Sequence, residues 1–162
     1  MSEFSVRPGR EEDAEGLVRA HEAGWDAALA PIVGKSLGDL APFDARVERA
    51  RAGLADRPEN VCAWVAEGDG DIVGMAIAGD DELRDLYVVP TAWGTGVSQA
   101  LMDAVLEWLH EREVEEAVLW VGEANARARR FYEREGWSAD GETRTSSLGP
   151  PELRYRVQLA VR

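Results

Sequence analysis

The stretch from Leu83 to Leu109 constrains the fold more than any other part of the sequence. The run Leu86-Tyr87-Val88-Val89 is rich in aromatic and β-branched residues and stops at Pro90, which predicts a strand. Apolar residues then recur at three- and four-residue spacing, which predicts a helix with one buried face; they are Val97, Leu101, Ala104, Val105, Trp108 and Leu109. Because Gly94 and Gly96 lie between the two, the stretch reads as a strand, a glycine turn and a helix.

A glycine turn before a helix can either bind an anion or have a purely structural role. The first amides of a helix lack internal partners and lie at the positive end of its dipole. Gly94 and Gly96 remove Cβ bulk, so the backbone can close around a phosphate or pyrophosphate. A P-loop is excluded because Val97-Ser98 follows the last glycine, and a Rossmann fingerprint is excluded because Gln99 replaces its third glycine. From this stretch alone, an anion site and a purely structural turn stay equally open.

Length and composition indicate one soluble domain covering residues 1–162. A chain of 162 residues can bury a two-layer core without disulfides. Its one cysteine, Cys62, lies in an apolar run, which favours a buried structural thiol over a nucleophile. The first residues lack a basic stretch followed by an apolar one, and no apolar segment reaches membrane-spanning length. We therefore expect a cytoplasmic protein without a membrane partner.

The charge balance argues against a nucleic-acid partner. The chain has 31 acidic and 18 basic residues, a net charge of −13, whereas binding a phosphate backbone requires clustered cations. An acidic surface tolerates cationic substrates, although solubility or a saline cytosol explains the same charge. Two distant histidines and one cysteine offer no metal-ligand set, so we expect neither a metal nor a redox enzyme.

The rest of the pattern predicts an α+β fold with a mixed central sheet. Helices are expected at 11–30 and from Asp44, which should cap the second one, and loops at 31–43 and 139–151. Strands are expected at 4–7, 61–67, 72–78 and 82–89, the last three joined by tight turns and therefore antiparallel. A strand at 115–121, a helix at 125–135 and closing strands at Trp137 and 154–159 complete about six to seven strands and about four helices.

Two motifs about thirty residues apart match a known family. Leu86 to Pro90, followed by Trp93 to Ser98, is similar to an acetyl-CoA signature that reads Arg or Gln, two residues, Gly, one residue, then Gly or Ala. The second motif comprises Asn125, Ala128, Phe131, Tyr132 and Gly136-Trp137. With both in order, the sequence resembles the GCN5-related N-acetyltransferase (GNAT) family over most of its length. Trp93 and Ser98 depart from the signature, because the family usually has Arg or Gln and Gly or Ala there.

The resemblance implies the acyl-CoA N-acyltransferase fold, with acetyl-CoA as donor and coenzyme A as product. In this family the strand before the signature splays from its neighbour and holds pantetheine, while the glycine-turn amides hold pyrophosphate. A strand amide, here that of Val88 or its neighbour, bonds the thioester oxygen. The implied cofactor residues are Leu86, Tyr87, Val88, Trp93, Gly94, Thr95, Gly96, Val97, Ser98, Asn125, Ala128, Arg129 and Phe131. The arginines at 127, 129 and 130 either meet the adenosine 3′-phosphate or only solubilise their helix.

The resemblance also implies direct acetyl transfer to a primary amine of a small molecule through a ternary complex. Tyr132 is the candidate general acid, its alternative being a core aromatic beside Phe131. Glu82 and Asp85 are candidate bases, with Glu82 ranked first, their alternative being solvated carboxylates. The candidate acceptor-binding residues, which could instead be core residues, are Trp25, His21 and Leu29.

Other functions stay open at this level. The chain could be a protein N-terminal or lysine acetyltransferase, or a sensor that binds acyl-CoA without catalysis. A sensor is expected to lack the leaving-group acid, so Tyr132 favours an enzyme. A peptide acceptor needs an open groove, and the loops 31–43 and 139–151 decide whether one exists. The family often forms homodimers, so a homodimer is the expected assembly.

Overall fold

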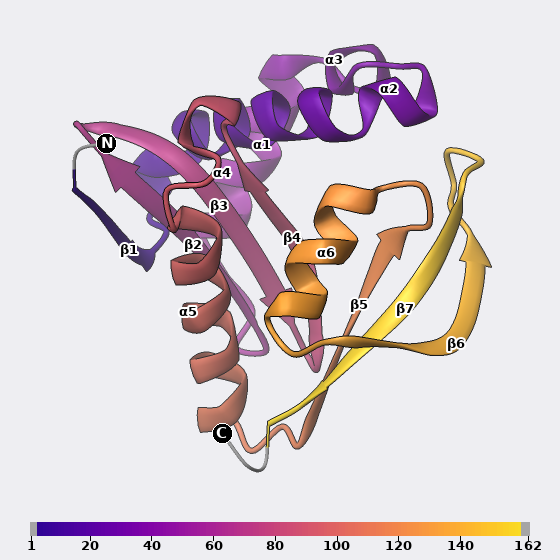
Figure 1. Ribbon diagram of the computed structural model, residues 1–162. Coiled ribbons are helices and arrows are strands. Elements are labelled where there is room, and N and C mark those ends of the chain that lie inside the picture. Colours follow the sequence, from indigo (N-terminus) through magenta and orange to yellow (C-terminus); the bar gives the residue numbers. More distant parts are fainter. Residues whose placement is uncertain (1–2, 160–162) are drawn as a thin grey trace.

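Seven strands form one mixed sheet in the computed structural model, which describes residues 3–159 (Figure 1). The strands lie in the order β1-β2-β3-β4-β5-β7-β6. Their bounds are β1 Phe4–Pro8, β2 Val61–Gly68, β3 Asp71–Gly79, β4 Glu82–Val88, β5 Glu116–Gly122, β6 Ser138–Thr145 and β7 Pro151–Gln158. The helices are α1 Ala14–Ala28, α2 Ala30–Val33, α3 Leu37–Leu40, α4 Phe43–Ala55, α5 Val97–Glu111 and α6 Ala126–Arg134. The predicted α+β class with a mixed sheet is confirmed.

Helices cover both faces of the sheet, and the strand alternation divides the core between them. On β2, Trp64 and Ala66 belong to the main apolar cluster with α5, whereas Val65 belongs to a second cluster with α1 and α4. Successive strand residues point to opposite faces, so both faces of this strand are buried. Figure 1 shows α5 and α6 in front of the sheet and α1 and α4 behind it. Cys62 is buried in β2, where burial raises the pKa of its thiol, as suits a structural residue.

Strands β4 and β5 are parallel neighbours that separate soon after they begin. Their register is Glu82 opposite Val118, and the Val118 N–H donates to the Asp81 carbonyl at 2.9 Å. The outer edges of the two strands stay paired, β4 with β3 and β5 with β7 along the whole of β5. The facing inner edges therefore diverge toward Val88 and Gly122 (Figure 1). This divergence leaves strand backbone facing a gap inside the sheet.

The segment predicted as a loop at 31–43 contains two short helices. Pro31 falls in the first turn of α2, where its missing N–H costs no helical hydrogen bond. Ser36 caps α3, accepting a hydrogen bond from the Asp39 N–H at 3.2 Å. The prediction that Asp44 caps the next helix is wrong, since α4 begins at Phe43 with Pro42 at the N-cap. Periodicity cannot reveal one-turn helices, because they are shorter than one repeat of the buried face.

The segment predicted as a loop at 139–151 contains most of β6. This strand pairs with β7 at the edge of the sheet, from Ser138 opposite Arg156 to Thr145 opposite Pro151. All its residues are exposed, so it has none of the apolar alternation from which strands are predicted. Its register shifts between Ala139 and Thr143, where Gly141 has a φ of +93°.

Candidate active site

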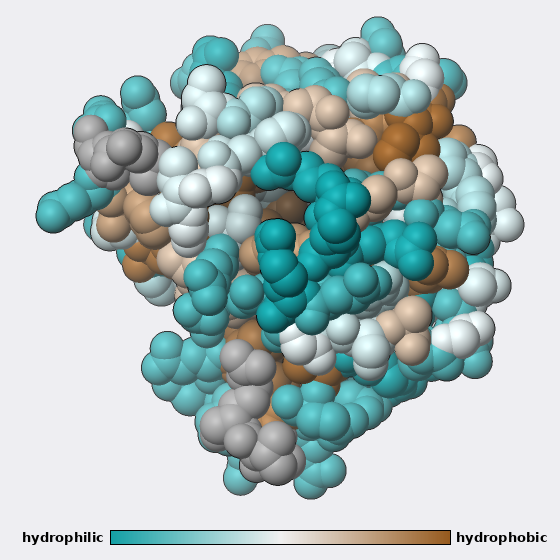
Figure 2. Space-filling model, viewed as in Figure 1, coloured by the Kyte–Doolittle hydropathy of each residue, from teal (hydrophilic) through white to brown (hydrophobic). Residues whose placement is uncertain are grey.

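A pocket of about 1200 Å³ lies at the gap between β4 and β5 and is lined by residues of both strands and of the helices around them. The glycine turn and α6 line it on one side, and α1, α2 and the 144–150 segment line it on the other. Figure 2, viewed as in Figure 1, shows a hollow near the centre of the surface that faces the reader, with strongly hydrophilic residues on its rim. Backbone that would pair within a continuous sheet is therefore accessible to a ligand.

The glycine turn forms one end of this pocket. Gly94 and Gly96 adopt φ values of +77° and +94°, which favour glycine, and Gly96 is the N-cap of α5. A Cβ at Gly94 would meet no atom within 4 Å, so the backbone conformation rather than crowding requires glycine there. Trp93 anchors the turn, since its Nε1–H donates to the Val88 carbonyl at 2.9 Å. The N-terminus of the 15-residue helix α5, with its free backbone amides, is thus fixed beside β4.

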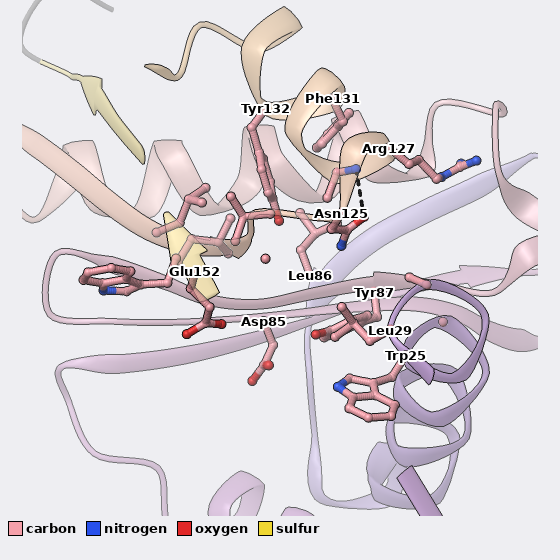
Figure 3. A pocket seen from close by; sticks show the side chains of 18 of the residues that line it. Trp25, Leu29, Asp85, Leu86, Tyr87, Asn125, Arg127, Phe131, Tyr132 and Glu152 are labelled. Atoms are coloured by element: carbon pink, nitrogen blue, oxygen red, sulfur yellow. Dashed lines mark hydrogen bonds between the residues drawn. The ribbon is translucent and has the colours of Figure 1, made fainter. Parts of the chain in front are cut away.

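Tyr132 projects from α6 into the middle of the pocket (Figure 3). Its ring packs among aromatic rings, with centroids 5.6 Å from Phe131 and 6.3 Å from Trp137. Burial raises the pKa of Tyr132, and the negative charge of Asp85 raises it further. The hydroxyl therefore keeps its proton at neutral pH, so it can donate one.

Four carboxylates line the same pocket: Glu82 and Asp85 from β4, Glu152 from β7, and Glu135 at the C-cap of α6. Burial raises the pKa of the Glu82 and Asp85 carboxyls above the usual range. Figure 3 shows the Asp85 and Glu152 carboxylates on the side of β4 opposite Tyr132. Glu152 is paired with Arg144 at 2.7 Å. A buried carboxylate of raised pKa is a better proton acceptor near neutral pH than an exposed one.

The acceptor-side candidates on α1 and at its C-cap divide into two groups. Trp25 and Leu29 line the pocket, on the same side of β4 as Asp85 (Figure 3). His21 does not line it; its ring lies against Tyr87, with centroids 4.9 Å apart. Burial lowers the pKa of His21, which matches a neutral ring behind the pocket wall. Gly24 permits this close packing, since a Cβ there would lie 3.0 Å from Tyr87 Cβ.

The pocket brings together most of the residues predicted for the cofactor. Besides Trp93, Gly94 and Gly96, it contains Leu86, Tyr87, Val88, Ser98, Asn125, Ala128 and Phe131. Asn125 also caps α6, its Oδ1 accepting from the Ala128 N–H at 3.3 Å.

Three predicted cofactor residues lie outside the pocket lining. Val97 is buried in the main core, and the Thr95 hydroxyl donates to the Ala92 carbonyl within the turn. Arg129 points elsewhere, since its Nε donates to the Tyr155 hydroxyl and its Nη1 to the Glu123 carbonyl, each at 3.0 Å. These bonds hold Arg129 against β7 and do not support a contact with the cofactor.

Glu152 is a pocket carboxylate that the sequence did not predict. Glu152 lies in β7 and pairs with Gly122 of β5. A local sequence pattern does not predict this pairing, because the two residues are distant in the chain. The prediction began the last strand at Arg154, so Glu152 fell outside it. The signal that could have revealed it is Pro150-Pro151, which marks the boundary between the preceding loop and a strand and places Glu152 near the start of that strand.

The fold and pocket together place a glycine turn at one end of the pocket and buried ionisable side chains further along it. A model of the acetyltransferase (GNAT) family matches residues 31–137. An uncharacterized N-acetyltransferase of Mycobacterium tuberculosis is 36% identical over 143 residues, covering 85% of this chain and 90% of the relative. The chain therefore belongs to the acetyltransferase (GNAT) family, and it is an enzyme of the acetyl-CoA-dependent N-acetyltransferase class.

Solved structures agree on the fold. The PaiA N-acetyltransferase of Thermoplasma acidophilum, crystallised with coenzyme A, has a TM-score of 0.74 at 16% identity, covering 96% of this chain and 99% of that one. An N-acetyltransferase of Staphylococcus aureus has a TM-score of 0.76 at 15% identity, covering 98% and 99%. At such identities the likeness concerns the fold alone. Within residues 3–159, none of the helices has the length and apolar character needed to cross a membrane.

Proposed function

We propose that this enzyme transfers the acetyl group of acetyl-CoA to the primary amine of a small molecule, by direct transfer in a ternary complex. The observation that supports this is the continuity of the pocket, which runs from the glycine turn, past the open edge of β4, to Tyr132 and the buried carboxylates. A donor with a phosphate at one end and a thioester at the other matches that order of groups.

The residues present fit such a donor. The pyrophosphate would lie on the amides of residues 94–98, where no Cβ intrudes at Gly94. The pantetheine arm would pair with the inner edge of β4 along Leu86 to Val88, with Ala128 and Phe131 beside it. Because the cap uses Asn125 Oδ1, a ligand bond from this residue would come from its Nδ2. A β4 N–H at or beside Val88 would bond the thioester oxygen.

The transfer requires proton movements that these side chains can serve. Glu82 or Asp85 would take the proton that the acceptor ammonium loses to become a neutral amine. That amine forms the new C–N bond at the carbonyl carbon, and the C–S bond breaks. We assign Tyr132 as the acid that protonates the departing sulfur, since its hydroxyl is protonated and points into the pocket. The second proton, which the nitrogen loses as the amide forms, would restore the Tyr132 hydroxyl. The acceptor would approach from the Trp25 and Leu29 side.

Two chain segments flank the acceptor end of the pocket. Ile32 and Val33 of α2 line the pocket, as do residues 144–148 and 150. These are the two segments whose placement decides between a small amine and a peptide. Their convergence on one pocket favours a small amine whose ammonium is attracted by the carboxylates. The homodimer, the cytoplasmic location and the absence of a nucleic-acid partner stay predictions.

Thermal unfolding with and without acetyl-CoA tests the proposal. A ligand that binds only the folded state stabilises it by about 2.7 kcal/mol at a hundredfold excess over Kd, so the transition should rise. A panel of small amines, read by thiol release, then identifies the acceptor. An unchanged transition in excess acetyl-CoA would contradict donor binding. Binding without thiol release from any small amine or peptide amine would indicate a sensor.

The pH dependence of kcat/KM should identify the base. The base acts as a carboxylate, so kcat/KM rises with pH through its pKa, which burial holds above the usual value of about 4 for both candidates. Replacing the base, by Glu82→Gln or Asp85→Asn, should remove this rising limb and lower the plateau, while the other variant keeps the limb. Glu107→Gln, an exposed change on α5, is the matched control. A limb retained in both pocket variants would exclude both carboxylates.

A further inference from the structure

We propose that Arg127, held by stacking on Trp93, is the cation that binds the donor's pyrophosphate at the glycine turn. The proposal rests on the proposed function, since it assumes a phosphate-bearing donor at that turn. The turn itself supplies no cation, because residues 90–98 contain neither lysine nor arginine. Any side-chain cation that binds the pyrophosphate must then come from another element.

Arg127 is placed at the turn by a specific contact. It stands in the first turn of α6 and lines the pocket (Figure 3). Its guanidinium carbon lies 3.6 Å from the centre of the Trp93 ring. That ring is itself fixed, since Trp93 packs against the main core and donates to the Val88 carbonyl. The contact therefore joins α6 to the residue immediately before Gly94.

The charges around Arg127 indicate an anion site. Within residues 3–159, none of the ion pairs includes Arg127, Arg130 or Arg134, although the whole chain has a net charge of −13. All three line the pocket, at positions three and seven residues apart along one helix face. Burial and the charges of Arg130 and Arg134 lower the pKa of Arg127. An anion bound at the turn would relieve this repulsion.

The stacked position of the Arg127 guanidinium suits the pyrophosphate at the turn better than the adenosine 3′-phosphate. A guanidinium that stacks through its face keeps its in-plane N–H groups free to bond two oxygens of one phosphate. Stacking also restricts the arginine before the ligand arrives, which lowers the entropy lost on binding. Because Trp93 adjoins Gly94, these N–H groups and the turn amides can converge on the same group. Arg130 and Arg134 lie further along α6 from the turn.

Truncated ligands test the assignment by calorimetry on the full chain. The Arg127→Gln variant should bind coenzyme A and dephospho-coenzyme A about tenfold to a hundredfold more weakly, by similar factors, because both contain the pyrophosphate. Pantetheine, which has no phosphate, should bind as it does to the wild type. Arg127→Lys should lose less than Arg127→Gln, since it keeps the charge. Arg112→Gln is the matched control, because Arg112 stacks on Trp108 at 4.8 Å and does not line the pocket.

The outcomes separate this proposal from the one it rests on. A loss seen with coenzyme A but not with dephospho-coenzyme A would assign Arg127 to the 3′-phosphate and overturn the proposal. An equal loss for pantetheine would show a structural role, and unchanged affinity for all three ligands would show no role; either result overturns it. In those cases binding by the wild type still supports the proposed function. A wild-type enzyme that binds neither phosphate ligand would overturn both.

Discussion

The Gly96→Leu enzyme is expected to fold and to lose most of its affinity for coenzyme A. A Cβ at this position would meet no atom closer than Phe4 Cζ at 4.0 Å, so the folded protein has room for a side chain. The side chain would instead stand before the first amides of α5. Each hydrogen bond to a charged phosphate is worth about 1.5–3 kcal/mol, so losing one or two should raise Kd about a hundredfold or more. Calorimetric titration with coenzyme A measures the change.

Backbone strain has to be separated from the blocked amides. Gly96 has a φ of +94°, where a non-glycine residue costs of the order of 1–2 kcal/mol. Gly70→Leu is the matched control, because Gly70 has a φ of +82° in the β2–β3 turn and its Cβ would meet nothing within 4 Å. Both variants should unfold at similarly reduced temperatures, but only Gly96→Leu should lose the ligand. Retained affinity in folded Gly96→Leu would mean that the turn is structural.

The sequence predicted the strands and helices that bury an alternating or helical face. Val97, Leu101 and Leu109 are fully buried in α5, as their spacing required. The errors occur where no such face exists. Strand β6 is exposed along its whole length, and α2 and α3 are single turns. Elements of this kind form because of their contacts with neighbouring elements in space, and local sequence propensity carries no information about those contacts.

The sequence predicts the site residues that belong to a single motif. It does not predict those that come from strands distant in the chain. Gly94, Gly96 and Tyr132 belong to contiguous motifs, and all three line the pocket. The motif did not distinguish the directions of neighbouring arginines on α6. Arg127 lines the pocket, whereas Arg129 turns toward Tyr155. Two residues apart on an α-helix, Arg127 and Arg129 point in directions about 200° apart around the axis. Only the packed structure shows which of these directions faces the pocket.

The Tyr132→Phe enzyme is expected to show a kcat lower by tenfold or more, with little change in KM for acetyl-CoA. The phenylalanine ring keeps the packing against Phe131 and Trp137 but cannot give a proton to the departing sulfur, and one proton transfer contributes at least this factor. Steady-state rates of thiol release measure it, once a small-amine acceptor is known. Tyr155→Phe is the control, because the Tyr155 hydroxyl bonds Arg129 and Glu133 rather than facing the pocket. It should lower stability and preserve kcat.

The alkaline side of the pH profile tests the same assignment without a mutation. Tyr132 donates only while protonated, and burial raises its pKa, so its activity is complete below that pKa and is lost as pH rises through it. For the wild type, kcat should therefore hold steady up to about pH 10, the ordinary tyrosine pKa. If Tyr132→Phe kept the wild-type kcat, the hydroxyl would have no part in the transfer. The sulfur would then leave as a thiolate, and Tyr132 would be a packing residue.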